Sequence, residues 1–216
     1  MQILCELRTA FFPPYMNANQ IAERTKQFEE GISSFLKHKD KLPSKTDVYL
    51  IDNTIKSEKD VPSTIARMLK EHSVRIVVFP DNTLGSKNKG AGEVGGLLFM
   101  RSEISKCDWF IHFEPRQVLK SFYFLESFLQ DPRTLFTINV ANPIPPHFNT
   151  GLYAASSPDM LKFLDCFTPE RLVEMVNMKQ NLENIMYSFF MKNTYCHLLD
   201  KMDLIWLSPE GNQYHW

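Results

Sequence analysis

Short apolar runs recur along the chain at intervals that suit an alternation of buried strands and amphipathic helices. Two segments carry apolar residues at helical spacing: Asn19–Lys37, with Ile21, Phe28, Ile32 and Phe35 on one face, and Glu58–Lys70, with Val61, Ile65, Met68 and Leu69. Five runs bounded by turn residues are expected to be strands: Ile3–Leu7, Val48–Ile51, Val74–Phe79, Trp109–Phe113 and Leu135–Val140. This alternation predicts an α/β protein with a mixed, mainly parallel sheet flanked by helices.

The pattern changes after Val140. The segment Asn142–Phe148 contains three prolines, which fix φ and remove backbone donors, so it is expected to be a loop. Apolar residues at helical spacing then predict one long helix from Pro169 to about Lys192, with the proline in its first turn.

The segment Asn88–Phe99 places glycines and a lysine at the start of an apolar helix. Helix N-termini present unpaired N–H groups and the positive end of the helix dipole, and glycines allow a phosphate to approach the backbone. The spacing Gly90-x-Gly92-x-x-Gly95 also matches the dinucleotide-binding fingerprint, but that motif begins directly at a strand end, and here the polar connection Pro80–Lys89 intervenes. Glycines that only let the helix pack closely on the sheet are the alternative.

The carboxyl ends of the expected strands are polar. They carry Arg8-Thr9, Asp52-Asn53-Thr54, Asp81-Asn82-Thr83 and Glu114-Pro115-Arg116. In an open parallel sheet, ligands collect outside these ends. Turns favour Asp, Asn and Thr in any case, so each residue alone is as readily structural as functional.

Composition narrows the class of protein. The chain has 216 residues, a length expected for one domain spanning 1–216, and 44% hydrophobic with 23% charged residues is typical of a globular protein. Net charge −1 gives no broad basic field for nucleic acid. The four cysteines show no metal-ligand or disulfide spacing, and no window is apolar enough for membrane insertion. A cytoplasmic location is therefore expected.

The arrangement resembles small GT-A-fold glycosyltransferases of the kind found in surface-polysaccharide gene clusters and encoded by large algal (chlorella) viruses. The resemblance covers roughly Ile3 to Tyr187. It depends on the strand ending Ile51-Asp52-Asn53, the Lys-Gly-x-Gly-Glu helix start, the strand ending at Glu114, and the later Asn149-Thr150-Gly151-Leu152-Tyr153. It implies a GT-A-like, Rossmann-like sheet, a nucleotide-sugar donor and a saccharide or glycan acceptor. A viral protein would act in the host cytoplasm.

The resemblance also assigns roles to residues. The nucleotide-sugar would be bound by Arg8, Thr9, Asp52, Asn53, Asp81, Lys89, Gly90 and Arg116, and the sugar or acceptor by His147, Asn149, Thr150 and Gly151. Glu114 would be catalytic, and Glu183 in the last helix is a further acidic candidate. The family strand usually ends in Asp-x-Asp and holds Mn²⁺ or Mg²⁺, whereas this one ends His112-Phe113-Glu114-Pro115-Arg116.

Two arrangements could stabilise the leaving diphosphate. Glu114 and Asp81 could hold Mn²⁺ or Mg²⁺ between them, which the resemblance slightly favours, or Arg116 and Lys89 could supply fixed positive charge. His112, one residue inside the strand, is expected to be a sheet residue. Trp206, Tyr214, His215 and Trp216 form an aromatic tail that could stack on a sugar or cover the core.

The sequence therefore favours a glycosyltransferase of hexosyltransferase type that uses a nucleotide diphosphate donor, with a UDP-sugar expected. Two alternatives stay open. One is an NAD-dependent Rossmann oxidoreductase that uses the Gly90-x-Gly92-x-x-Gly95 spacing, and the other is a non-enzymatic interaction domain on a degenerate transferase fold.

Overall fold

The computed structural model describes residues 1–79, 81–138, 146–193, 196–207 and 213–215, with only the backbone of 206–207 and 213–215. In chain order the elements are β1 (Ile3–Thr9), α1 (Ala18–Leu36), η1 (Lys39–Lys41), β2 (Thr46–Asp52), η2 (Glu58–Asp60), α2 (Ser63–Glu71), β3 (Arg75–Val78), α3 (Lys89–Phe99), α4 (Arg101–Ile104), β4 (Trp109–Phe113), β5 (Gln117–Leu119), α5 (Tyr123–Gln130), β6 (Thr134–Thr137), β7 (Leu152–Ser156), α6 (Ser157–Leu164), α7 (Pro169–Asn177), α8 (Leu182–Asn193), β8 (Cys196–Leu199), β9 (Leu204–Leu207) and β10 (Gln213–His215).

The central sheet has seven strands in the order β3-β2-β1-β4-β7-β6-β8. Strands β3, β2, β1 and β4 pair in parallel, β7 runs antiparallel to both neighbours, and β6 pairs with β8 in parallel. A second, antiparallel sheet has the order β10-β9-β5. The mainly parallel α/β architecture predicted from the sequence is therefore confirmed.

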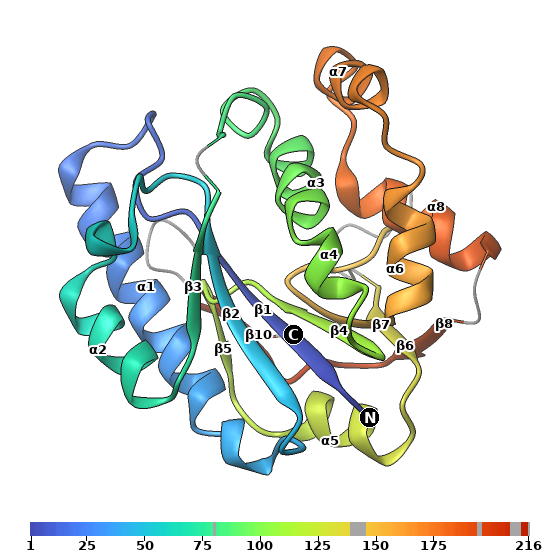
Figure 1. Ribbon diagram of the computed structural model, residues 1–216, viewed down its shortest axis with the longest axis horizontal. Coiled ribbons are helices and arrows are strands. Elements are labelled where there is room, and N and C mark those ends of the chain that lie inside the picture. The colour runs from blue at the N-terminus through green and yellow to red at the C-terminus, as the bar shows by residue number, and fades with distance from the viewer. Residues whose placement is uncertain (80, 139–145, 194–195, 208–212, 216) are drawn as a thin grey trace.

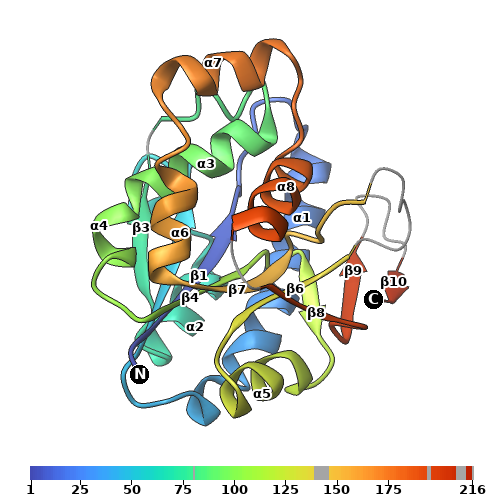
Figure 2. The ribbon, with the colours of Figure 1, turned by 90° about the vertical axis from the view of Figure 1, so that its right-hand side faces the viewer.

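Helices cover both faces of the central sheet. Helices α1 and α2 lie on one side of β1–β3, whereas α3, α4 and α6 lie on the other (Figure 1). Seen from the side, α7 lies above α3, at the edge where the parallel strands end (Figure 2). The chain passes from β1 to α1 on one face and reaches β4 through α3 on the other, so β1 and β4 flank a topological switch point.

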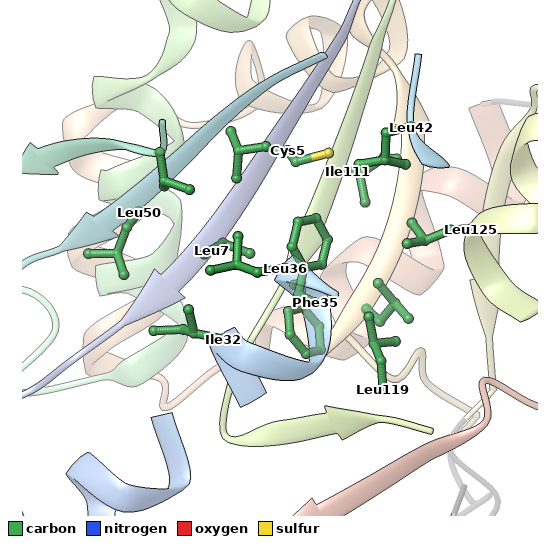
Figure 3. Close-up of a cluster of buried hydrophobic side chains, with 14 of the residues drawn as sticks. Cys5, Leu7, Ile32, Phe35, Leu36, Leu42, Leu50, Ile111, Leu119 and Leu125 are labelled. Carbon is green, nitrogen blue, oxygen red and sulfur yellow. The ribbon is translucent and has the colours of Figure 1, made fainter. Parts of the chain in front are cut away.

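The alternation of side chains along β1 divides the interior into two parts. Ile3, Cys5 and Leu7 pack in the core beneath α1, together with Phe35 and Leu50 (Figure 3). Leu4 belongs to the second hydrophobic cluster, on the opposite face. Because successive strand residues point to opposite faces, Glu6 and Arg8 lie on the α3 side, although both are buried. Glu6 and Arg8 therefore bring charged groups into the interior beside α3.

Local sequence accounts for the helix boundaries. Asn17 caps α1 through a capping box with Gln20, and Thr168 caps α7 with Pro169 at its first position. Pro62 separates the predicted helix at 58–70 into η2 and α2.

The prediction of one long helix from Pro169 to Lys192 was wrong. The structure has two helices, α7 and α8, because Lys179 adopts a positive φ of 49° and ends the first one. Residues 139–140 of the predicted fifth strand and residues 142–145 of the proline-rich loop lie outside the described residues. None of the described helices combines the length and the apolar character needed to cross a membrane.

Candidate functional site

A pocket opens at the carboxyl edge of the parallel strands, between β1, β2, β4 and the start of α3. This is the switch point where open α/β sheets bind ligands. Its lining residues are Arg8, Thr9, Ala10, Pro13, Tyr15, Arg24, Phe28, Asn53, Thr54, Asn82, Gly85, Lys89, Gly92, Glu93 and Glu114. We call the part around Asn53, Thr54 and Asn82 the asparagine end, and the part around Arg24, Lys89, Glu114 and the adjoining Arg116 the arginine end.

A carboxylate held between two cations forms the centre of the arginine end. Lys89 Nζ lies 3.3 Å from Glu114 Oε2, and Arg116 Nε donates to Glu114 Oε1 over 2.7 Å, with Arg116 Nη2 on the same oxygen. Burial alone would raise the pKa of Glu114, but Arg116 and Lys89 lower it far below its ordinary value. Glu114 is thus firmly ionised, and the group keeps a net positive charge.

Arg24 joins this group from α1, and it is not among the site residues predicted from the sequence. Its side chain is buried, with 8% exposed, and lines the pocket. A signal was present, because Arg24 is three residues after Ile21 and four before Phe28 and so falls on the predicted apolar face. A charge on such a face is buried at a cost in free energy that a solvent-exposed charge does not have, so it points to a functional role.

A buried polar cluster lies beneath the pocket. Glu6 pairs with Arg8 Nε at 2.9 Å and with His112 Nδ1 at 3.1 Å, and His112 Nε2 lies 3.7 Å from Glu93 Oε1. The ring of Tyr153 stacks on His112 with centroids 4.9 Å apart. Burial raises the pKa of Glu93, and the nearby His112 and Lys89 only partly oppose it.

The asparagine end is held together by its own hydrogen bonds. Asp52 is fully buried and accepts from the backbone N–H groups of Phe11, Thr54 and Ile55 at 2.9, 2.6 and 3.0 Å, and from the Thr54 hydroxyl at 2.7 Å. Asn53 Nδ2 donates to Asn82 Oδ1 over 2.9 Å. Asp52 therefore shapes the turn rather than facing the pocket, which corrects its expected nucleotide contact, whereas Asn53 lines the pocket.

The first strand also supplies predicted residues to the pocket. Thr9 is buried and donates from its hydroxyl to the Ile51 carbonyl over 3.3 Å. Arg8 donates from Nη2 to the Glu93 carbonyl over 3.1 Å, in addition to its pair with Glu6. Both residues line the pocket, but the guanidinium of Arg8 is engaged with α3.

Gly90 does not contact the pocket. A Cβ at Gly90 would lie 2.8 Å from Met175 Cε and 2.9 Å from Leu182 Cβ, so this glycine permits close packing of α7 and α8 on α3. The Asn88 side chain caps α3 by accepting from the Ala91 N–H over 3.0 Å. The structure therefore supports the packing interpretation at Gly90, and phosphate binding by its backbone stays a prediction.

Two further glycines of this helix, Gly92 and Gly96, also permit close packing. A Cβ at Gly92 would lie 2.4 Å from the Gly85 α-carbon, and one at Gly96 would lie 2.0 Å from Arg8 Nη1. Ten residues, 79–88, separate the end of β3 from the start of this helix. Both facts disagree with a dinucleotide fingerprint, in which glycines form the turn directly after the strand.

The predicted metal ligands do not form a chelating set. Asp81 is exposed and accepts from the Thr83 N–H over 2.9 Å, outside the pocket lining, while Glu114 is already paired with two cations. Among the described residues, no group of three His, Cys, Asp or Glu side chains is arranged to hold a metal ion. Hard cations require several oxygen ligands, so these donors do not fit Mn²⁺ or Mg²⁺.

The remaining predicted residues lie outside the pocket lining. The Asn149–Gly151 turn supports the arginine end, because the Gly151 carbonyl accepts from the Glu114 N–H over 2.8 Å and Thr150 is buried. His147 precedes this turn and is half-buried, and Glu183 is half-buried at the start of α8. The side chains of the aromatic tail, Trp206 and Tyr214 to Trp216, lie outside the described residues.

Known structures share this fold. A protein of Desulfovibrio desulfuricans G20, provisionally assigned as a nucleotide-diphospho-sugar transferase, has TM-score 0.56 and 8% identity over 92% of this chain and 80% of its own. Mouse xyloside xylosyltransferase 1, in its apo form, has TM-score 0.47 and 12% identity over 92% of this chain and 84% of its own. No protein-family model matches the sequence, and no curated protein matches it significantly. The likeness to the Desulfovibrio protein agrees with the mixed α/β fold described above.

Proposed function

We propose that this protein is a glycosyltransferase that takes a sugar from a nucleoside diphosphate donor, with a UDP-sugar expected, and transfers it to a saccharide acceptor. The observation that carries the proposal is the pocket at the β1–β4 switch point, which has neutral amides at one end and a net positive group at the other. A nucleoside diphosphate has matching parts, a polar base and ribose followed by a dianionic diphosphate.

The two ends suggest how the donor lies. Asn53 and Asn82 offer amide groups to the base or ribose. Thr9, at the end of β1 between β2 and β4, lines the same pocket. Lys89 and Arg116 are placed to bind the diphosphate. The sugar would then lie towards Glu114 and Glu93, and we keep the Asn149–Gly151 turn, His147 and Glu183 as candidates for the acceptor side.

The chemistry of transfer agrees with this charge distribution. When the acceptor oxygen forms its bond to the anomeric carbon and the bond to the diphosphate breaks, negative charge develops on the leaving group. Fixed cations can stabilise that charge as a metal ion would. Because the donor set does not fit a divalent cation, we favour Lys89 and Arg116 for this role. Glu114 then orients the two cations, since it accepts from both.

Ligand-induced thermal stabilisation tests the proposal. The protein is incubated with UDP, GDP, dTDP or NAD, each in EDTA and in Mn²⁺, and its melting temperature is measured. A ligand that binds only the folded state raises Tm by mass action, so at least one nucleoside diphosphate should raise Tm while NAD does not. A larger shift with NAD would contradict the proposal and support an oxidoreductase.

Turnover distinguishes an enzyme from a binding module. The donor that binds is incubated with mono- and oligosaccharide acceptors, and release of the nucleoside diphosphate is followed. Transfer is expected for at least one acceptor, and slow hydrolysis is expected without one. Binding without release of any product would support the alternative of a non-enzymatic interaction domain on a transferase fold.

A further inference from the structure

Arg24 is a buried cation without a carboxylate partner in the described chain. Only 8% of the residue is exposed, and no described carboxylate oxygen lies within 4.0 Å of its guanidinium. Its Nη1 donates to the Met16 thioether over 3.3 Å, Tyr15 lies close enough to interact, and its Nε is buried without a hydrogen bond. A thioether and a phenol are weak partners for a guanidinium, because neither carries a compensating charge.

A second guanidinium faces the same space. Arg24 and Arg116 both line a small hollow that adjoins the arginine end of the pocket, and Arg24 lines both. Burial, and then repulsion from Arg116, lowers the pKa of Arg24. Glu23 also lines the hollow, but it forms no ion pair with either arginine among the described residues.

The local charge is unbalanced. Three cations, Arg24, Arg116 and Lys89, gather around Glu114, which pairs with two of them. Glu93 lines the same pocket, but its pKa is raised by burial, and among the described residues it forms no ion pair with any of the three. Buried charges in proteins are paired or bind an ion, because removing a charge from water is costly unless an opposite charge replaces the solvent. A dianionic ligand would restore the balance, whereas a neutral one would not.

We propose that Arg24 and Arg116 together bind one phosphate group of the donor diphosphate, while Lys89 binds from the side of α3. The proposal rests on the proposed function for the identity of the donor. Planar guanidinium groups match the oxygens of a phosphate and can donate two parallel hydrogen bonds. Arg24 comes from α1, Arg116 from the segment after β4 and Lys89 from α3, so the three would approach the diphosphate from different elements.

A purely structural role for Arg24 makes the opposite prediction about stability. If Arg24 only packs against Phe28, whose ring centroid lies 5.7 Å from its Cζ, its replacement should lower the melting temperature. If it is an uncompensated charge kept for a ligand, Arg24→Gln should raise the melting temperature of the ligand-free protein and weaken anion binding. Opposite signs for stability and affinity are the signature of a residue retained for binding.

Calorimetric titration with inorganic pyrophosphate in EDTA tests this, because pyrophosphate is the shared core of every candidate donor. The variants are Arg24→Gln, Arg24→Lys, which keeps the charge but not the fork of donors, and Arg67→Gln as a matched control on the exposed side of α2. Arg24→Gln should bind pyrophosphate about tenfold more weakly or worse, Arg24→Lys should fall between, and Arg67→Gln should match wild type. Melting temperature should rise in Arg24→Gln by about 2 °C or more.

The outcomes separate this inference from the proposed function. The role of Arg24 would be overturned if wild type does not bind pyrophosphate, or if Arg24→Gln binds it as tightly as wild type. It would also be overturned if Arg24→Gln has a lower melting temperature or fails to fold. Each of these results would count even if UDP binds. If wild type binds pyrophosphate through Arg24 but no nucleoside diphosphate raises its Tm, the anion site stands and the donor assignment fails.

Discussion

The two ends of the pocket differ in whether their polar groups find partners within the chain. At the asparagine end, the Asp52 carboxylate accepts three hydrogen bonds from its own turn and one from the Phe11 N–H beyond β1, and Asn53 donates to Asn82. At the arginine end, Arg24 has no carboxylate partner among the described residues, and one carboxylate, Glu114, serves two cations. One end is complete without a ligand, and the other is not.

This difference separates residues that build the site from residues that await a ligand. A polar group whose partners all lie in the chain contributes to stability, and its loss should damage the fold. A buried charge without a partner costs stability, and its loss should damage only binding. The following predictions test that distinction, from the largest expected effect to the smallest.

Removal of the Asp52 carboxylate should have the largest effect. Asp52→Ala leaves three backbone N–H groups and the Thr54 hydroxyl without their acceptor and should lower the free energy of unfolding by about 4 kcal/mol. Urea unfolding measures this loss. Asp52→Asn, which retains one acceptor oxygen, should lose less, and a stability equal to wild type in Asp52→Ala would show that the turn does not depend on these bonds.

Gly90 should behave as a packing residue. Gly90→Ala places a Cβ 2.9 Å from Leu182 Cβ and should destabilise the protein by about 1–3 kcal/mol, and Gly90→Val by more. Gly95→Ala is the matched control in the same helix, because its Cβ would meet only the Phe79 ring, at 3.5 Å. It should be neutral or stabilising by up to about 1 kcal/mol, since Ala favours helix. Equal stability of the two alanine variants, in thermal or urea unfolding, would contradict this.

Lys89 should affect binding and not stability. Lys89→Ala removes a mostly exposed ammonium and should weaken nucleoside diphosphate binding by about 1.5–3 kcal/mol, the range of a charge-assisted hydrogen bond. Melting temperature should change little. The exposed Lys87 gives the control Lys87→Ala, which should bind like wild type in the same calorimetric titration. An unchanged affinity in Lys89→Ala would remove this residue from the site.

Glu93 should limit stability in a pH-dependent way. Burial raises its folded-state pKa above the ordinary 4.5, so stability is complete below that value and falls as pH rises through the folded-state pKa. Glu93→Gln removes this penalty and should be more stable than wild type at neutral pH, with the gain disappearing as pH falls below the ordinary pKa of a glutamate. Urea unfolding at several pH values measures this difference, and a gain independent of pH would contradict it.

The smallest expected effect is that of a metal ion. Because Glu114 is paired with Lys89 and Arg116, Mn²⁺ should change the affinity for a nucleoside diphosphate by less than about twofold relative to EDTA. A strong Mn²⁺ dependence that Glu114→Gln abolishes would restore the metal arrangement. Calorimetric titration of both proteins distinguishes the two cases.

Local pattern was sufficient to predict the first half of the fold. The runs that became β1, β2, β3 and β4 and the face that became α1 follow from alternation and helical spacing, because each element must bury one side. The polar strand ends were equally readable, and Arg8, Thr9, Asn53, Lys89 and Glu114 do line one pocket. The carboxyl ends of parallel strands lie at the same edge of the sheet, so residues that follow different strands lie close together there although they are distant in sequence.

Contacts between distant segments decided the rest. Gly90 looks like a phosphate-binding residue until Met175 and Leu182, more than eighty positions away, pack on it. Arg24 lies on an apolar helix face, and it becomes part of a cationic site only because Arg116, which follows β4 in the chain, lines the same hollow. Sequence determined which groups could do chemistry at the sheet edge. Burial and pairing determine which of them remain available to a ligand, and both depend on neighbours that only the tertiary structure supplies.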